Sequence, residues 1–327
     1  MPKTLTHTYF ILDVYDELDK KSQQRLINHK EYLKTFAEST NILYLYNFNN
    51  CNNKKKVKNL IHNFHTKKTK EFFENLIKYI KSNKLEKNPE IIALLYGFIS
   101  HYILDITLHP YIYYKSGILD KKKKNTYKYN GMHEDIESYF DAYMIYTKEG
   151  IEPKKFKLHQ FLYNINSLSP ETISMLDWVF AETYNHPNIG RIYGKAIKRA
   201  KRITKKFMYD PLGFKKGVYK IIDKITSKST KKLETLSYCI HHKKKQYYLN
   251  LDKNVWHHPV DQNETYNYSF IEMYRIAILK TLDIINKVNT ILYNNKELTI
   301  LDELFSDLSY ETAKPCYERQ KMIYFEF

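Results

Sequence analysis

The sequence predicts an all-α protein, and three observations support this prediction. Eight glycines and nine prolines in 327 residues are too few to punctuate a strand-rich fold. Apolar residues recur mostly at helical rather than alternating spacing. Hydrophobic residues make up 43% of the chain, which is enough to form a large buried core. Because no repeat or clear linker divides the sequence, we expect a single helical domain over residues 1–327.

Helical spacing covers most of the chain, and two proline-containing motifs mark helix starts. Asn88 and Ser169 each stand directly before a proline, a combination typical of a capped helix. Residues 41–48 are apolar and aromatic and should form a short strand or a buried extended segment, whereas residues 49–56 should form a loop. The expected helices cover residues 8–18, 23–33, 58–81, 91–108, 132–146, 169–182, 190–208, 213–219 and 267–292, and the tail from residue 304 is expected to be irregular.

The segment over residues 91–108 is apolar nearly all round, which predicts a helix buried at the centre of the fold. Pro110 lacks a backbone N–H and hinders helix continuation, so we expect the helix to end close to it. His109 would then lie near the exit of the helix. Polar side chains within such an apolar segment need partners, because burying an unpaired imidazole or carboxylate is costly.

The formal net charge of +17 has two interpretations. It can attract phosphate, as nucleic acid, as an anionic membrane surface or as a phosphorylated substrate. It can also reflect coding bias, because Lys, Asn, Ile and Tyr are all abundant. The lysine runs at residues 54–56, 121–124 and 243–245 are scattered through expected loops, which favours coding bias. No helix-turn-helix, RNA-recognition or zinc-finger motif is present, although nucleic acid is not excluded as a partner.

Cysteine usage and the N-terminal sequence indicate a cytoplasmic location. Cys51, Cys239 and Cys316 are far apart and form no CxxC pair, which argues against a disulfide framework and against thiolate zinc. The first apolar stretch is short and interrupted by Asp13, and it does not resemble a signal peptide. No uninterrupted apolar run approaches the ~20 residues that span a bilayer.

Five residues of types that bind metal ions stand in two groups with four-residue spacing in the middle of the chain. His101, Asp105 and His109 stand four residues apart, and His133 and Glu137 form a second pair with the same separation. A single buried histidine is more often an ordinary hydrogen-bonded core residue. The repeated spacing of five such residues instead predicts a metal site on facing helices.

Helix geometry limits how these residues can share metals. His101 and His109 lie ~12 Å apart along a helix axis, so they cannot both bind one ion. Asp105 stands halfway between them and has two oxygens, which suits a cluster of two or three cations with a shared carboxylate. Histidine and carboxylate ligands without cysteine favour catalytic zinc. Clustered metal ions are a common device for hydrolysing phosphate esters.

The segments HYILDITLHPYI and HEDIESYFD resemble the metal-binding core of the zinc-dependent phospholipase C family. The resemblance is greatest to short, uncharacterised bacterial members. It implies an all-helical, trinuclear-zinc fold shared with fungal single-strand nucleases, with a metal-binding core in residues 1–145 and a C-terminal helical part in residues 146–327.

The resemblance also implies further ligands outside the five-residue pattern. His7 matches a histidine that the family uses close to the N-terminus. His65 is the better match for an upstream histidine, and His62 is its competitor. The implied zinc sites are His65 with His101 and Asp105, His109 with His133 and Glu137, and His7 with Asp105.

Three departures from the family pattern bear on activity. Asn41 stands where the family has an aspartate that is a candidate base, and an amide brings no charge and accepts no proton. Six residues precede His7, whereas secreted members begin at a residue whose own amino group and carbonyl bind zinc. Asp105 and His109 are also closer in sequence than in the secreted enzymes. We therefore expect an altered cluster, with Asp105 and Asn41 as candidate catalytic residues.

The leading functional hypothesis is a metal-dependent hydrolase of phosphate esters, a phospholipase C-like phosphodiesterase that uses a zinc-activated water. One alternative is a catalytically weakened or non-enzymatic relative with a structural metal site. Another is a nuclease or nucleotide phosphatase. The expected partners are a phosphate-ester substrate, such as a phospholipid, and an anionic membrane surface.

Other polar residues have ordinary interpretations. Asp135 and Asp141 either orient ligands or are plain surface carboxylates. His241 and His242 stand beside a lysine run and are expected to be solvated. The adjacent pair at residues 257–258 precedes a proline and is expected to form a structural turn.

Overall fold

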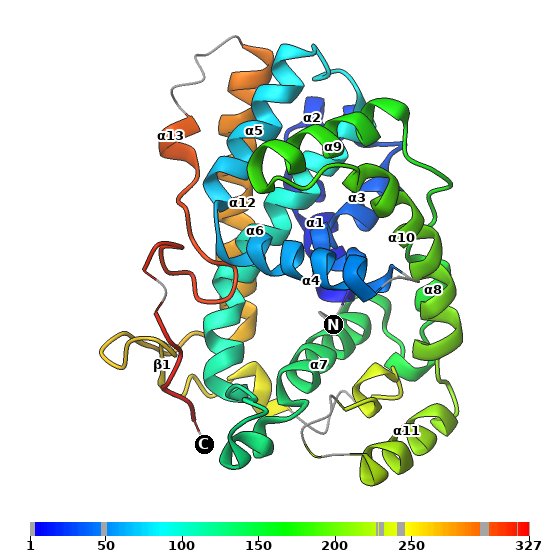
Figure 1. The fold of residues 1–327 in the computed structure, drawn as a ribbon, viewed down its shortest axis with the longest axis vertical. Coiled ribbons are helices and arrows are strands. Elements are labelled where there is room, and N and C mark those ends of the chain that lie inside the picture. Colours follow the sequence, from blue (N-terminus) through cyan, green and yellow to red (C-terminus); the bar gives the residue numbers. More distant parts are fainter. Residues whose placement is uncertain are drawn as a thin grey trace.

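The protein is all-α, as the sequence predicts (Figure 1). The computed structural model describes residues 4–46, 51–226, 228, 232–240, 246–294, 301–318 and 320–326, without the side chains of residues 51–53 and 302. In this part of the chain the helices are α1 (Thr4–Glu17), α2 (Lys20–Leu26), α3 (Lys30–Phe36), α4 (Cys51–Thr66), α5 (Thr69–Ser82), α6 (Pro89–Ser116), α7 (Met132–Glu149), α8 (Leu158–Phe161), α9 (Pro170–Tyr184), α10 (Ile189–Ile203), α11 (Phe214–Ile225), α12 (Phe270–Tyr293) and α13 (Leu301–Leu304).

Short helical turns and one small sheet complete the described structure. The strands β1 (Trp256–His257) and β2 (Thr265–Tyr266) pair antiparallel, with Trp256 opposite Tyr266. The turns are η1 (Ser39–Leu45), η2 (Lys124–Tyr129), η3 (Pro153–Lys155), the π-helical η4 (Thr204–Met208), η5 (Glu234–Leu236) and η6 (Gln246–Leu249). Since α12 from the C-terminal part packs against α6, the two parts share one core. That the whole chain forms one domain remains a prediction.

Helix α6 lies at the centre, where α1, α3, α7 and α12 pack against it (Figure 1). Nearly all its side chains are buried, in agreement with the all-round apolar sequence. The expected end before Pro110 is wrong, because the helix continues through Pro110 to Ser116. His109, Pro110 and Tyr111 are all buried, so tertiary packing holds the helix together where proline removes one backbone hydrogen bond. His109 therefore projects from the helix interior.

Helix α6 is also long and apolar enough to cross a membrane by length and composition alone. The expectation that no segment approaches this length was therefore too strict. Its most apolar 18-residue window is 89% buried inside the protein, which is the environment of a core helix.

Gly97 allows α3 to approach α6 closely. A Cβ atom at this position would lie 2.7 Å from the backbone carbon of Phe36, far inside van der Waals contact. Only glycine therefore permits this spacing without a shift of one helix. The contact sets the position of the residues that follow α3, including Ala37 and Asn41.

Several expected boundaries differ from the structure. Residues 41–45 form no strand or extended segment but belong to the largely buried turn η1, which ends before Tyr46, and residues 47–48 lie outside the described residues. The expected loop at residues 49–56 is wrong from Cys51 onward, where α4 begins, and residues 49–50 lie outside the described chain. Residues 23–33 and 58–81 each divide into two helices, because the chain turns at His29 and at Lys68, whose φ is +53°.

The capped helix starts are confirmed. The Asn88 side chain accepts hydrogen bonds from the backbone N–H groups of Glu90 and Ile91. The Ser169 side chain accepts one from Thr172. These contacts satisfy backbone donors that have no partner within the helix. The other helices expected after residue 130 also form, with ends shifted by a few residues and with residues 204–208 in a π-helical turn.

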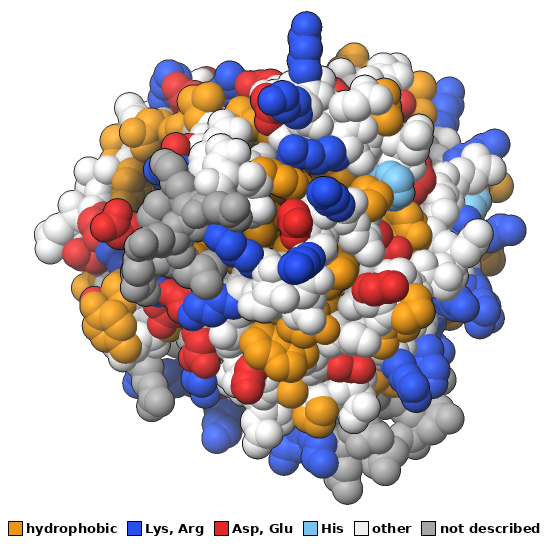
Figure 2. Space-filling model, turned by 90° about the horizontal axis from the view of Figure 1, so that it is seen from above, with side chains coloured by type: hydrophobic (Ala, Val, Ile, Leu, Met, Phe, Trp, Pro, Cys, Tyr) orange, Lys and Arg blue, Asp and Glu red, His pale blue; other side chains and the backbone are white. Residues whose placement is uncertain are grey.

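Basic side chains are dispersed on the face shown in Figure 2. Lysine and arginine side chains there lie among acidic, hydrophobic and uncharged groups rather than in one stripe.

Candidate metal centre

The structure brings together all the side chains that the sequence singled out as metal ligands. They come from four helices: His7 from α1, His65 from α4, three residues from α6 and two from α7. His133 is partly exposed and the others are buried. The complete set is His7, His65, His101, Asp105, His109, His133 and Glu137.

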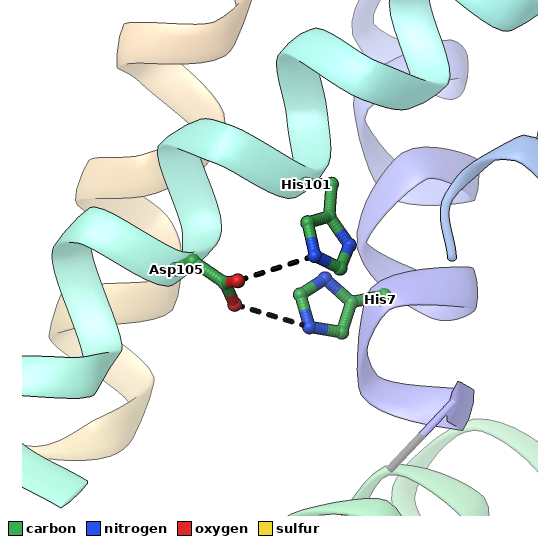
Figure 3. A group of neighbouring side chains, drawn as sticks. All are labelled: His7, His101 and Asp105. Atoms are coloured by element: carbon green, nitrogen blue, oxygen red, sulfur yellow. Dashed lines mark ion pairs between the residues drawn. The ribbon is translucent and has the colours of Figure 1, made fainter. Parts of the chain in front are cut away.

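Three of these residues form a buried inner group: His7, His101 and Asp105 (Figure 3). The Nε2 atom of His7 lies 3.3 Å from Asp105 Oδ1, and the Nε2 atom of His101 lies 3.2 Å from Asp105 Oδ2. The two imidazole rings stack with centroids 4.2 Å apart. Each histidine therefore points its outer nitrogen at a different oxygen of one carboxylate.

A second, outer group contains His109, His133 and Glu137. Glu137 Oε1 lies 3.2 Å from His133 Nε2 and 3.7 Å from His109 Nε2. Asp105 Oδ1 lies 3.7 Å from the same His109 nitrogen, so Asp105 connects the inner and outer groups. This is the shared-carboxylate arrangement that the four-residue spacing predicts.

Backbone carbonyls orient three of the histidines. The Nδ1 atoms of His65, His101 and His109 each lie 2.7 Å from a carbonyl oxygen, those of Ile61, Ala37 and Tyr310 respectively. Because a carbonyl can only accept a hydrogen bond, each Nδ1 carries the proton. In a neutral ring the Nε2 atom then presents its lone pair. This is the arrangement by which proteins prepare histidines to bind metal.

The electrostatics of the inner group fit a cation. Burial lowers the pKa of His101, so its Nε2 lone pair faces a carboxylate oxygen without a proton between them. Burial alone would raise the pKa of Asp105, but His109, His101 and His7 outweigh it and hold that pKa well below its usual range. Two electron-rich atoms 3.2 Å apart repel each other unless a positive ion lies near both.

Unsatisfied polar atoms also indicate room for metal ions in the described structure. The buried oxygens Asp105 Oδ2 and Glu137 Oε2 have no hydrogen-bond partner there. Buried polar atoms normally have partners, so such a cluster needs an explanation. The mixed imidazole and carboxylate donors suit zinc, and the residues therefore fit the metal that the sequence predicts.

His109 differs electrostatically from His101. Burial acts to lower its pKa, but the carboxylates of Asp105 and Glu137 outweigh burial and raise the pKa to about 9. His133 and His109 hold the pKa of Glu137 far below its usual range, against the effect of burial. The outer group is therefore a strongly coupled ion-pair cluster when no metal neutralises it.

His65 is the better of the two upstream candidates. It is buried, with its ring centroid 6.2 Å from that of His101, whereas His62 is exposed. Burial lowers the pKa of His65 to about 4, so the ring is neutral at physiological pH. His7, rather than His65, stands with His101 and Asp105 in a group of closely spaced ligand atoms, and the implied zinc sites stay a prediction.

Asn41 also belongs to the cluster. It is 5% exposed, and its Nδ2 donates a hydrogen bond of 3.0 Å to the Nε2 atom of His101. The amide thus interacts with the same lone pair that faces Asp105. The position suits a polar residue at the metal centre, and it is an amide rather than a carboxylate that fills it.

Asp141 is buried rather than a surface carboxylate. It accepts hydrogen bonds from the backbone N–H groups of Leu5 and Thr6 and from the hydroxyl of Tyr238. A carboxylate at a helix N-terminus is stabilised by the helix dipole. Asp141 therefore fixes the start of the helix that carries His7, while Asp135 accepts from Tyr248.

Two contributors to the site have no signal in the sequence. Glu38 is buried, and burial raises the pKa of its carboxyl to about 8, with the carboxylates of Asp141, Asp105 and Glu137 adding to the rise. Tyr310 acts through backbone atoms: its carbonyl accepts from His109, and its N–H donates to the carbonyl of His65. A backbone contact from a distant segment leaves no residue-type pattern to recognise.

The histidine pair at residues 257–258 does not join the cluster. His257 Nδ1 and His258 Nε2 hydrogen-bond to the backbone carbonyls of Gln262 and Thr312, which fits the expected structural role. The prediction for His241 and His242 falls outside the described residues.

The outer group opens into a cavity of about 730 Å³. Asn41, His65 and Asp105 also line this cavity, so both metal groups border the same space. Four lysines line it as well, namely Lys54 and Lys58 from α4, Lys121 and Lys232. The cavity is therefore lined by both candidate metal ligands and cationic side chains.

Comparison with known families agrees with this geometry. Residues 5–179 match a family model described as zinc dependent phospholipase C. The matched segment covers more than half of the chain and includes every candidate ligand from His7 to Glu137. The chain belongs to the zinc-dependent phospholipase C family. No protein of curated function and no solved structure matches it.

Family membership indicates a metal-dependent, phospholipase-like hydrolase with zinc as its metal and a phosphate ester as its substrate class. The all-α fold agrees with that assignment. Residues 180–327 lie beyond the matched segment, although Tyr310 from this part contacts two of the histidines at the candidate metal centre.

Proposed function

We propose that the protein is a phospholipase C-like phosphodiesterase, with zinc held by the inner and outer groups. The observation that carries this proposal is the sharing of Asp105 between two sets of metal-type ligands at the floor of one cavity. Zinc would act there as a Lewis acid toward water and a phosphoryl oxygen.

The side chains of the site have different roles in this proposal. Asp105 holds the two groups at a fixed separation, and the carbonyls of Ala37 and Tyr310 keep His101 and His109 turned toward the centre. Lys54 and Lys58 on the cavity wall favour an anionic phosphate over a neutral ligand. Asn41 can hold an oxygen by hydrogen bonding but cannot take a proton.

Hydrolysis would place the water oxygen on phosphorus and break the bond from phosphorus to the glycerol oxygen. The glycerol oxygen leaves as diacylglycerol after gaining a proton, and the headgroup leaves as a phosphate monoester. A phosphate monoester, a nucleotide or single-stranded nucleic acid is the alternative substrate within the same chemistry.

The direct test is metal content and product analysis. Purified protein loaded with zinc should contain at least two zinc ions per chain by elemental analysis. It should release a phosphorylated headgroup and diacylglycerol from a phospholipid. Less than one zinc per chain, or no phosphate ester cleaved in a panel of phospholipids, nucleotides and oligonucleotides, would contradict the proposal.

A second candidate function is a metal-stabilised protein with lost catalysis, and Asn41 is the observation that favours it. The Asn41→Asp variant separates the two functions. An inactive parent that this change activates would indicate lapsed catalysis. An active parent would reject a purely structural role for the metals.

A further inference from the structure

Helix α11 exposes an apolar stripe to solvent. Phe214, Val218, Ile221 and Ile225 follow one another at helical spacing and lie on one face, and their exposed fractions are 76%, 39%, 63% and 79%. Leu212, directly before the helix, is 91% exposed. In the part of the chain that is described, α11 buries none of its own residues. Figure 1 shows it at the lower edge, away from the helices around α6.

The opposite, polar face of α11 is turned toward the protein. Asp223 accepts hydrogen bonds of 2.8 and 2.9 Å from the backbone N–H groups of Leu233 and Glu234. The ammonium of Lys216 donates to the carbonyl of Cys239, and the hydroxyl of Tyr219 donates to that of Phe207. A surface helix normally packs its apolar face inward, so α11 has the reverse orientation.

Exposed lysines border the apolar stripe. Lys220 and Lys224 stand four residues apart and are both exposed. On a helical projection Lys224 lies beside Ile221, whereas Lys220 lies between Ile221 and Asp223, closer to Asp223. An apolar stripe flanked by lysine is the pattern of a helix that lies in the headgroup region of a membrane.

Helix α11 is attached directly to the wall of the cavity. The Leu233 and Glu234 backbone atoms that bond to Asp223 belong to the same segment as Lys232 and Leu236, which line the cavity. This segment includes η5, which packs against α11. A surface that binds α11 is therefore close to the cavity wall.

We propose that α11 docks the protein on an anionic lipid surface, with Phe214, Ile221 and Ile225 inserted among the headgroups and Lys220 and Lys224 facing anionic lipid. The charge of the flanking lysines favours this occupant over an uncharged protein groove. Docking does not depend on the proposed hydrolysis, although it would bring a lipid substrate close to the zinc centre.

The test is co-sedimentation of the full-length, zinc-loaded protein with vesicles. Vesicles of phosphatidylcholine with phosphatidylglycerol should bind the parent protein, and added salt should weaken binding. The Ile221→Ser, Ile225→Ser double variant should bind at least about tenfold more weakly. Replacing Lys220 or Lys224 by alanine should weaken binding about fivefold for each lysine.

Matched controls separate docking from a general loss of apolar surface. Ile271 and Leu279 of α12 are 46% and 52% exposed, so the Ile271→Ser, Leu279→Ser variant should bind as the parent does. Phe214→Trp supplies a second measurement, because its fluorescence should shift to the blue on anionic vesicles. The α11 variants all change exposed side chains, so their melting temperatures should match that of the parent protein.

The outcomes that would overturn the proposal are distinct. Equal vesicle binding by the parent and the double variant would reject α11 as the docking element. Absence of parental binding would reject the lipid surface, and a parental dimer that the double variant dissociates would assign the stripe to a second copy. Vesicle binding without hydrolysis of the vesicle lipids would reject those phospholipids as substrates and leave docking intact.

Discussion

The inner and outer metal groups use similar residues in different surroundings. His101 is 1% exposed and is locked by the carbonyl of Ala37, whereas the side chain of His133 is 24% exposed and borders the cavity. Burial keeps His101 neutral, while two carboxylates raise the pKa of His109 to about 9. The inner group is part of the core, and the outer group faces the space where a substrate would bind.

The largest expected effect comes from the residue that the two groups share. Asp105→Asn keeps the size of the side chain but removes the charge and one metal-binding oxygen. We expect zinc in both groups to be lost or weakened and hydrolysis to fall by more than about a hundredfold. Elemental analysis and initial rates measure the two effects. A variant that retained the parental zinc content would show that Asp105 does not join the groups.

Replacing one histidine in each group should separate stability from activity. His101→Ala removes a buried ring and leaves the Ala37 carbonyl without its partner, so it should cost about 2–4 kcal/mol of folding free energy without metal. His133→Ala should cost less than about 1 kcal/mol, because its ring is partly exposed. Both should reduce activity.

Denaturant unfolding after treatment with a chelator measures this difference. His62→Ala is the control, since His62 borders the cavity but is exposed and is no part of either group. If His101→Ala and His133→Ala destabilised the protein equally, the inner group would contribute no more to folding stability than the outer group.

Gly97→Ala should disturb the inner group without touching a ligand. The added methyl meets the backbone of Phe36, so α3 must shift and overpacking should cost about 1–3 kcal/mol. The shift would move the Ala37 carbonyl away from His101 and weaken zinc binding about tenfold. Gly217→Ala in α11 is the control, because a Cβ there meets nothing. Unchanged zinc affinity in Gly97→Ala would show that the carbonyl is not needed.

The last prediction concerns the stability effect of Glu38, the buried residue directly before η1. Its folded-state pKa of about 8 exceeds the unfolded value, so the folded protein holds a proton that the unfolded chain loses above about pH 4.5. As the pH rises from about 4.5 to about 8, Glu38 therefore lowers the free energy of unfolding of the metal-free protein. Glu38→Gln removes the loss and should stabilise at pH 8 by on the order of 1–3 kcal/mol, but not at pH 4. Equal shifts in melting temperature at both values would contradict it.

The clustering of the candidate ligands of α6 and α7 could be predicted because side chains four residues apart share a helix face whatever the details of packing. The course of α6 through Pro110 could not, since burial of its neighbours outweighs a local preference. The turn at Ser39–Leu45 was missed for a similar reason: its apolar residues are buried without a regular period. Predictions from sequence worked where the pattern itself determines geometry and failed where tertiary contacts decide it.

The backbone hydrogen bonds from Tyr310 to His65 and His109 have a consequence for when the candidate metal centre forms during synthesis. A ribosome delivers the chain from its N-terminus, so every metal ligand emerges long before residue 310. Until then His109 lacks the carbonyl that fixes its ring, and the nascent protein holds an incomplete centre. The candidate metal centre is therefore completed late in synthesis, by residues outside the segment that carries its candidate ligands.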